Sequence, residues 1–226
     1  MNLYDTEEYK GYKIEIWYDE DPENPRTDWD PISTMVCWHS MYYLGDSESW
    51  KGMDGKCHSQ QLSKNYSEPI DLLYELAGLD REDCEDEDGN DLSFEDLYTK
   101  IEERGTIISP LYLYDHSGIT ISMGSFLCPW DSDLVGWIYM TKDKIAENWG
   151  TDKEAYEKAI KCMEGEVETY DDYLTGNVYG FSVVKEDEED VLYSCGGFYG
   201  DLEESGLLEE AKRTIEYYLE QTPLEA

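Results

Sequence analysis

The segment 84–95 (CEDEDGNDLSFE) carries oxygen ligands at a spacing that could bind calcium. On the 12-residue EF-hand template, positions 3, 5, 6 and 12 are Asp86, Asp88, Gly89 and Glu95. The glycine permits the sharp turn of such a loop, and the final glutamate supplies two oxygens to the ion. Position 1, however, is Cys84 instead of aspartate. The sequence therefore favours a solvated acidic loop, with a degenerate calcium-binding module (Asp86, Asp88 and Glu95) as an alternative.

A second set of candidate residues flanks the strands expected in the middle of the chain: Asp115, His116, Asp131 and Asp133. Carboxylates that converge with a histidine suit a divalent metal or general acid–base chemistry. A metal-dependent enzyme that uses the 115–133 loops is therefore the main alternative function. Asp115-His116-Ser117 contains the residue types of a catalytic triad, but sequence neighbours cannot align as a relay, so a turn is expected there.

Other signals of catalysis or cofactor binding are weak. Cys37 and His39, and Cys57 and His58, lack the two-to-four-residue ligand spacing of structural zinc sites. The sequence contains no phosphate-binding glycine motif of either the P-loop or the dinucleotide type. We expect no cofactor, and no catalytic residues outside the 115–133 alternative.

Charge is the strongest compositional feature. The 226 residues include 54 Asp and Glu against 17 Lys and Arg, a net charge of −37. With 20 Tyr, 7 Trp and 7 Met, large rings and thioethers can still build a core. The same charge repels nucleic acid and anionic lipid, so we expect neither direct nucleic-acid binding nor membrane binding.

The density of negative charge resembles that of DNA. A compact chain of this length is about 45 Å across, and a duplex of that length carries roughly 26 phosphate charges. A protein with comparable charge can occupy the basic groove of a nucleic-acid-handling enzyme. Helices and tight hairpins hold carboxylates at fixed spacing, so we predict that a basic partner binds at Asp86, Glu87, Asp88, Glu186, Asp187, Glu188, Glu189, Asp190, Glu203 and Glu204.

Residue periodicity predicts an α+β fold with a mostly antiparallel sheet and flanking helices. Strands are expected at 12–18, 34–38, 106–114, 119–123, 134–140, 178–185 and 191–195. Helices are expected after the N-caps Ser67, Ser93 and Thr141 or Thr151, and near the C-terminus. We expect a single domain, residues 1–226, with residues 66–105 as a candidate helical insertion.

The sequence also suggests a compartment. The acidic residues of Met1–Lys10 do not fit a signal peptide, and no apolar run is long enough to span a bilayer. The six cysteines lack the paired spacing of a disulfide scaffold. These features predict a cytoplasmic protein with reduced thiols.

Two stretches resemble a family of uncharacterised proteins carried by bacteriophages, plasmids and integrative conjugative elements. The resemblance covers mainly residues 12–46 and 106–140. It rests on the segments DWD (28–30), TMVCWH (34–39), YLGD (43–46), PLYLYDHSGITIS (110–122), CPWDS (128–132) and VGWIY (135–139). Asp133-Leu134 departs from the family pattern, where a glycine and a polar residue stand.

That family carries no established activity, so the resemblance transfers no residue role. It implies a context, because small acidic proteins of mobile elements often inhibit host restriction or CRISPR systems, some of them as DNA mimics. The leading hypothesis is therefore an anti-CRISPR or anti-restriction inhibitor. It would act in the host cytoplasm and bind a host nucleic-acid-handling complex through an acidic surface.

Overall fold

The computed structural model describes residues 2–39, 41–46, 70–80, 84, 91–127, 132–185 and 190–221. The chain divides into two compact units. The terminal unit comprises Met1–Asn24 and Thr169–Ala226, and the central unit comprises Pro25–Glu168. The described residues form two four-stranded antiparallel sheets and five helices, which confirms the predicted α+β class.

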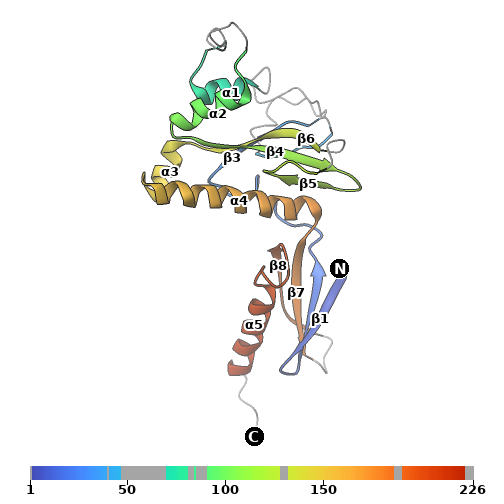
Figure 1. The fold of residues 1–226 in the computed structure, drawn as a ribbon. Coiled ribbons are helices and arrows are strands. Elements are labelled where there is room, and N and C mark those ends of the chain that lie inside the picture. Colours follow the sequence, from blue (N-terminus) through green and yellow to red (C-terminus); the bar gives the residue numbers. More distant parts are fainter. Residues whose placement is uncertain are drawn as a thin grey trace. The chain divides into compact units, whose positions relative to one another are not determined.

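The sheet of the terminal unit has the strand order β1-β2-β7-β8. Its strands are β1 (Leu3–Tyr9), β2 (Tyr12–Tyr18), β7 (Val178–Lys185) and β8 (Val191–Tyr199). Helix α5 (Leu207–Gln221) packs on one face of this sheet (Figure 1). The core between them contains Ile14, Ile16, Phe181, Val183, Leu207, Ala211 and Ile215.

The pairing of β2 with β7 explains this core. Ile14 lies opposite Val183 and Ile16 opposite Phe181. Because side chains alternate across a strand, these four residues point to the same face of the sheet. The alternation in YKIEIWY (12–18) therefore reports a half-buried strand, as predicted.

The sheet of the central unit has the order β3-β6-β4-β5. Its strands are β3 (Thr34–Cys37), β4 (Ile107–Asp115), β5 (Ile119–Ser122) and β6 (Ser132–Met140). Helices α1 (Ile70–Ala77) and α2 (Phe94–Glu103) lie on one face, and α4 (Lys153–Thr175) runs along the other (Figure 1). Helix α3 (Lys142–Trp149) follows β6 directly. From Thr169 onward, α4 belongs to the terminal unit.

The core under α1 and α2 is built around Trp137. This tryptophan is fully buried with Leu72, Leu73, Leu97 and Ile101. Its indole Nε1 donates a hydrogen bond of 2.8 Å to the hydroxyl of Tyr98, so its polar atom is satisfied inside the core.

Several predicted helix starts agree with the structure. Ser93 caps α2 in a reciprocal capping box with Asp96, and Thr141 caps α3. Thr151 does not cap α4, because the Asp152 carboxylate accepts the hydrogen bond from the backbone N–H of Ala155 at 2.8 Å. Ser67 lies outside the described residues.

Two strands differ from the prediction. Strand β1 was not predicted, because its sequence LYDTEEY is mostly exposed and lacks a regular apolar alternation. Strand β8 continues to Tyr199, past the expected end at Cys195. Its register against β7 shifts between Tyr179 and Phe181, so Gly196-Gly197 lies at an irregularity inside the strand and not after its end.

The sequence predicts a single domain, and the chain is built from two compact units. Each unit has its own sheet and its own buried cluster. Both ends of the chain contribute strands to one sheet, since β1 and β2 pair with each other and β2 pairs with β7. The segment 66–105 contributes α1 and α2 to the central unit.

Candidate protein-interaction surface

Negative charge is concentrated in the terminal unit. Its 82 residues include 23 acidic and 5 basic residues, a net charge of −18. The central unit carries 31 acidic and 12 basic residues, a net charge of −19 over 144 residues. The terminal unit therefore has about 1.7 times the net charge per residue of the central unit.

Helix α5 presents part of this charge as a stripe. The stripe consists of three exposed glutamates, Glu209, Glu216 and Glu220. The second and third follow Glu209 by seven and eleven positions, which places all three on one face of the helix. The helical rise separates successive members by about 10 and 6 Å. Hydrogen bonds from Lys10 and Tyr9 lower the pKa of Glu216, and its ion pair with Lys10 at 2.7 Å offsets part of its negative charge.

The turn before α5 holds two more carboxylates. Glu203 and Glu204 are exposed, and their backbone N–H groups donate to the side chain and the carbonyl of Asp201, at 2.8 and 3.1 Å. These bonds fix the backbone of the turn. The two carboxylates are therefore presented from an ordered segment.

An aromatic groove lies between β8 and α5. Its cavity of about 330 Å³ is lined by Tyr193, Glu210, Arg213, Thr214, Tyr217 and Tyr218. Tyr217 is 60% exposed and Tyr193 37% exposed. The Tyr218 hydroxyl donates to the carbonyl of Leu192 at 3.0 Å, which ties the helix to the strand.

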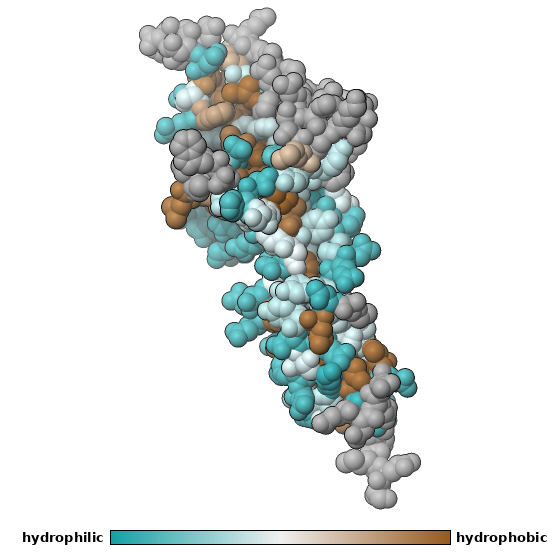
Figure 2. Space-filling model, turned by 90° about the vertical axis from the view of Figure 1, so that its right-hand side faces the viewer, coloured by the Kyte–Doolittle hydropathy of each residue, from teal (hydrophilic) through white to brown (hydrophobic). Residues whose placement is uncertain are grey.

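The residues of this groove are of the kinds that dominate binding energy at protein interfaces. Tyrosine and arginine are enriched at such hot spots. Exposed Val191 and Leu219 extend the apolar character of β8 and α5, and β8 is an edge strand of its sheet. On the face seen in Figure 2, hydrophilic residues cover most of the described surface, and hydrophobic residues form separate patches.

The predicted partner-binding acids are only partly described. Asp190, Glu203 and Glu204 are exposed residues of the terminal unit. The other predicted residues, Asp86, Glu87, Asp88, Glu186, Asp187, Glu188 and Glu189, lie outside the described residues. The sequence did not predict the aromatic groove, although the Tyr217-Tyr218 pair of α5 was a signal for it.

The structure brings two of the four residues of the enzyme alternative close to a different histidine. Asp115 and Asp133 both act electrostatically on His39, and the Tyr42 hydroxyl donates to Asp115 at 3.0 Å. His39 stacks on Tyr42 with ring centroids 4.8 Å apart. Burial lowers the pKa of His39, and the two carboxylates oppose that shift.

His116 does not join this group through a described contact. It lies in the turn between β4 and β5, and its ring centroid is 6.1 Å from that of Tyr114. Asp131 lies outside the described residues. Within the described ranges, no three His, Cys, Asp or Glu side chains are arranged to hold a metal ion.

The calcium alternative involves residues that are described in part. Cys84, at position 1 of the template, is buried, and its thiol donates to the carbonyl of Asp80 at 3.1 Å. Glu95 lies in the exposed first turn of α2. Asp86 and Asp88 are not among the described residues, nor are Cys57 and His58. Cys37 is buried in β3, and burial raises the pKa of its thiol.

Arg26 forms a buried ionic network that the sequence did not predict. It is 3% exposed, and its guanidinium donates to Asp46 at 2.7 Å and to Glu166 at 2.8 Å. Burial raises the pKa of Asp46, and the charge of Arg26 opposes this shift. The network connects the 25–33 segment and the residues after β3 with α4, inside the central unit.

Comparison with known proteins finds no protein-family model, no curated protein and no solved structure that matches the chain. Among the described helices, none is both long enough and apolar enough to cross a membrane.

Proposed function

We propose that this protein is an anti-defence inhibitor from a phage or mobile element. It binds a basic host nucleic-acid-handling complex, a CRISPR effector or a restriction nuclease, in the host cytoplasm. The observation that carries the proposal is the net charge of −37, of which −18 belongs to the 82-residue terminal unit. The resemblance to mobile-element proteins supplies the biological context.

The terminal unit matches a duplex in charge per length. A compact body of 82 residues has a radius of gyration near 12 Å, hence a diameter of about 30 Å. Duplex DNA of that length carries roughly 18 phosphate charges. The terminal unit would therefore compete with DNA for a basic groove on comparable electrostatic terms.

The groove between β8 and α5 supports a specific contact in addition to the electrostatic one. Charge attraction sets the rate of encounter, while buried aromatic contacts mainly determine how slowly a complex dissociates. The groove lies on the same helix as the Glu209, Glu216 and Glu220 stripe. A basic partner could thus contact the carboxylates and insert a side chain between Tyr193 and Tyr217.

The test begins with capture of the partner from a host lysate on the immobilised full-length protein, followed by affinity measurements from 0.05 to 0.5 M NaCl. We expect a nuclease or effector subunit whose affinity falls steeply with salt and which nucleic acid displaces. Salt-independent affinity, or simultaneous binding of nucleic acid at the same partner site, would contradict mimicry.

Charge reversal then locates the surface. Glu203→Lys with Glu209→Lys changes the terminal unit, and Glu164→Lys with Glu168→Lys makes the same charge change on exposed positions of α4 in the central unit. We expect the first pair to weaken binding far more than the second. Equal losses would indicate diffuse charge attraction without a defined site.

A further inference from the structure

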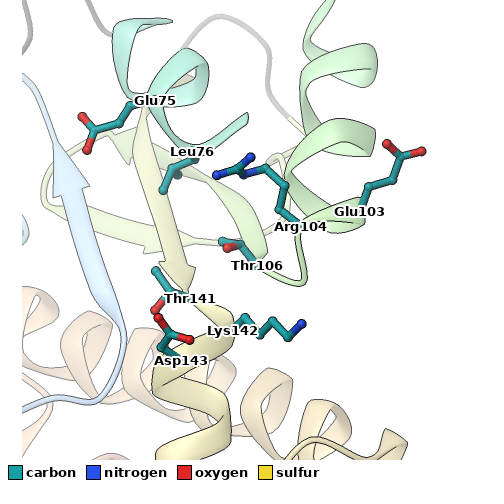
Figure 3. A pocket seen from close by; sticks show the side chains of 8 residues that line it. All are labelled: Glu75, Leu76, Glu103, Arg104, Thr106, Thr141, Lys142 and Asp143. Carbon is teal, nitrogen blue, oxygen red and sulfur yellow. The ribbon is translucent and has the colours of Figure 1, made fainter. Parts of the chain in front are cut away.

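The central unit contains a polar pocket that the proposed function does not use. Its cavity of about 550 Å³ lies between the C-terminal ends of α1 and α2 and the N-terminus of α3 (Figure 3). Pockets for small ligands typically have volumes of about 300–1,000 Å³. The pocket is therefore large enough for a small organic molecule.

Arg104 supplies a cation with no described counter-charge. Seven other lysines and arginines form ion pairs with carboxylates among the described residues. Arg104 makes neither an ion pair nor a side-chain hydrogen bond with any described residue. Lys100, Lys144 and Lys161 also form no ion pair among the described residues, so what distinguishes Arg104 is its place in the pocket, beside Lys142.

The guanidinium packs against Gly78. A Cβ atom at position 78 would overlap Nη1 and Cζ of Arg104, so a larger residue there would displace this flexible end of the side chain. In Figure 3 the guanidinium points between Leu76 and Thr106, whereas the carboxylates of Glu75 and Glu103 point outward on opposite sides. The donors of Arg104 are thus available inside the pocket.

Thr106 provides a second hydrogen-bonding group that a ligand in the pocket can reach. The residue is only 8% exposed and lines the pocket. Its hydroxyl makes no hydrogen bond with any described residue. No buried side-chain N or O atom among the described residues lacks a hydrogen-bond partner, so this hydroxyl is reached by solvent from the pocket, and a ligand there can replace the water that solvates it.

The N-terminus of α3 adds positive potential at the far side of the cavity. Thr141 caps this eight-residue helix, and Thr141, Lys142 and Asp143 all line the pocket. The first N–H groups of a helix lack intrahelical acceptors, and the helix dipole favours an anion near them, whereas the C-terminal ends of α1 and α2 at the same pocket oppose it. The carboxylate of Asp143 lies beside Thr141 in Figure 3.

We propose that this pocket binds a small organic anion through a single phosphate or carboxylate group. Arg104 donates to two oxygens of this group, in the forked geometry that guanidinium groups form with such anions. The Thr106 hydroxyl donates a third hydrogen bond to the ligand. Asp143 disfavours a second anionic group and accepts a hydrogen bond from a hydroxyl or amine elsewhere on the ligand. The ligand class is therefore a hydroxylated or amino-substituted monoester phosphate or carboxylic acid.

Two probes with the same three-carbon skeleton separate the two anionic groups: glycerol 3-phosphate and glycerate, with uncharged glycerol as the control. Each probe is titrated into the full-length protein, and binding is measured by calorimetry and by the NMR chemical shifts of the Arg104 side-chain N–H groups. We expect saturable binding of one or both anions and none of glycerol. Failure of both anions to saturate would overturn the proposal.

Variants test the residues independently of charge. Arg104→Lys keeps the charge but loses the fork, and Thr106→Val keeps the shape but loses the hydroxyl; we expect each to weaken binding about tenfold. Lys100→Ala removes a cation from α2 outside the pocket and should leave affinity unchanged. Wild-type affinity in both pocket variants, or an equal loss in Lys100→Ala, would refute the site. Should Arg104→Lys unfold, Thr106→Val still decides.

Discussion

Arg26 and Glu166 lie 140 positions apart in the sequence, and Nη1 of Arg26 is 2.8 Å from Oε2 of Glu166. The same carboxylate accepts hydrogen bonds from the backbone N–H of Ile32 at 2.8 Å and from the Ser33 hydroxyl. Glu166 therefore satisfies a loop backbone as well as a buried cation. A carboxylate of α4 organises the segment that leads into β3.

Removal of Arg26 should destabilise the protein more than any surface ion-pair substitution. Arg26→Met leaves Asp46 and Glu166 as partly buried carboxylates without their cation, so we expect a loss of about 3–5 kcal/mol in the free energy of unfolding. Glu166→Gln retains acceptor capacity and should cost less, about 1–3 kcal/mol. Urea unfolding followed by tryptophan fluorescence measures both.

The control for this prediction is Lys158→Gln, which breaks the exposed Lys158–Glu154 pair on the same helix. Its effect should be far smaller, because solvent already screens that pair. A similar effect for Lys158→Gln and Arg26→Met would show that the buried network contributes no more than surface charge.

Two glycines offer a matched test of packing. A Cβ atom at Gly180 would lie 2.2 Å from the indole Cη2 of Trp17, so Gly180→Ala must displace the ring, whose Nε1 bonds to Ser182 Oγ at 3.2 Å. We expect a loss of about 1–3 kcal/mol in stability. Gly165 in α4 has open space at its Cβ position, so Gly165→Ala should stabilise by about 0.5–1 kcal/mol. Thermal unfolding compares the two, and a stabilising Gly180→Ala would contradict the observed packing.

Local patterns predicted most of the fold. Strand β2 and helix α5 each bury a regular set of residues, such as Ile14 and Ile16, and Leu207, Ala211 and Ile215, so their periodicities are visible in the sequence. Strand β1 escaped prediction because pairing with β2, and not burial, positions it. The Lys10-Gly11 turn, with positive φ at both residues, was the available signal.

The candidate sites were harder to predict because their residues meet only in the fold. Arg26, Asp46 and Glu166 come from three distant segments. Arg104 and Thr106 are ordinary residues at a helix end until α1 and α3 close the pocket around them. The metal alternative proposed His116, but the histidine on which Asp115 and Asp133 act is His39, from the residues after β3.

His39 should make stability depend on pH. Its folded-state pKa is lowered from 6.5, mainly by burial, so the unfolded chain binds the proton more readily. The contribution of His39 to stability is therefore complete above pH 6.5 and is lost as the pH falls below that value. We expect His39→Gln to show a shallower loss of stability between pH 7 and 5.

NMR titration of the His39 ring tests the cause of the shift. The Asp115 charge raises the pKa of His39 against the effect of burial, so Asp115→Asn should lower this pKa further. A rise in the pKa of His39 in that variant would show that the electrostatic assignment is wrong.

Salt should stabilise the fold. The −37 charge opposes compaction, and raising NaCl from 0.01 to 0.1 M shortens the screening length from about 30 to 10 Å. We expect the melting temperature to rise by several degrees in scanning calorimetry, and an unchanged value would show that self-repulsion is unimportant.

Calcium at 0.1 mM adds too little ionic strength to screen the charges of the protein. A rise in melting temperature caused by 0.1 mM calcium alone would therefore support the calcium-binding alternative.

Tyr217 should matter for partner binding in a way that charge does not. It is 60% exposed beside Tyr193, so Tyr217→Ser removes contact area without opening the core. We expect about a tenfold loss of affinity, in the range of interface hot spots. Leu127→Ser, at a fully exposed position of the central unit, is the matched control and should have no effect. Surface plasmon resonance across a salt series separates the aromatic contact from the charge attraction. Tyr217→Ser should speed dissociation and leave the salt dependence of the association rate unchanged. Glu209→Lys should slow association and reduce its salt dependence. If Tyr217→Ser instead left dissociation unchanged, the groove between β8 and α5 would not be part of the interface.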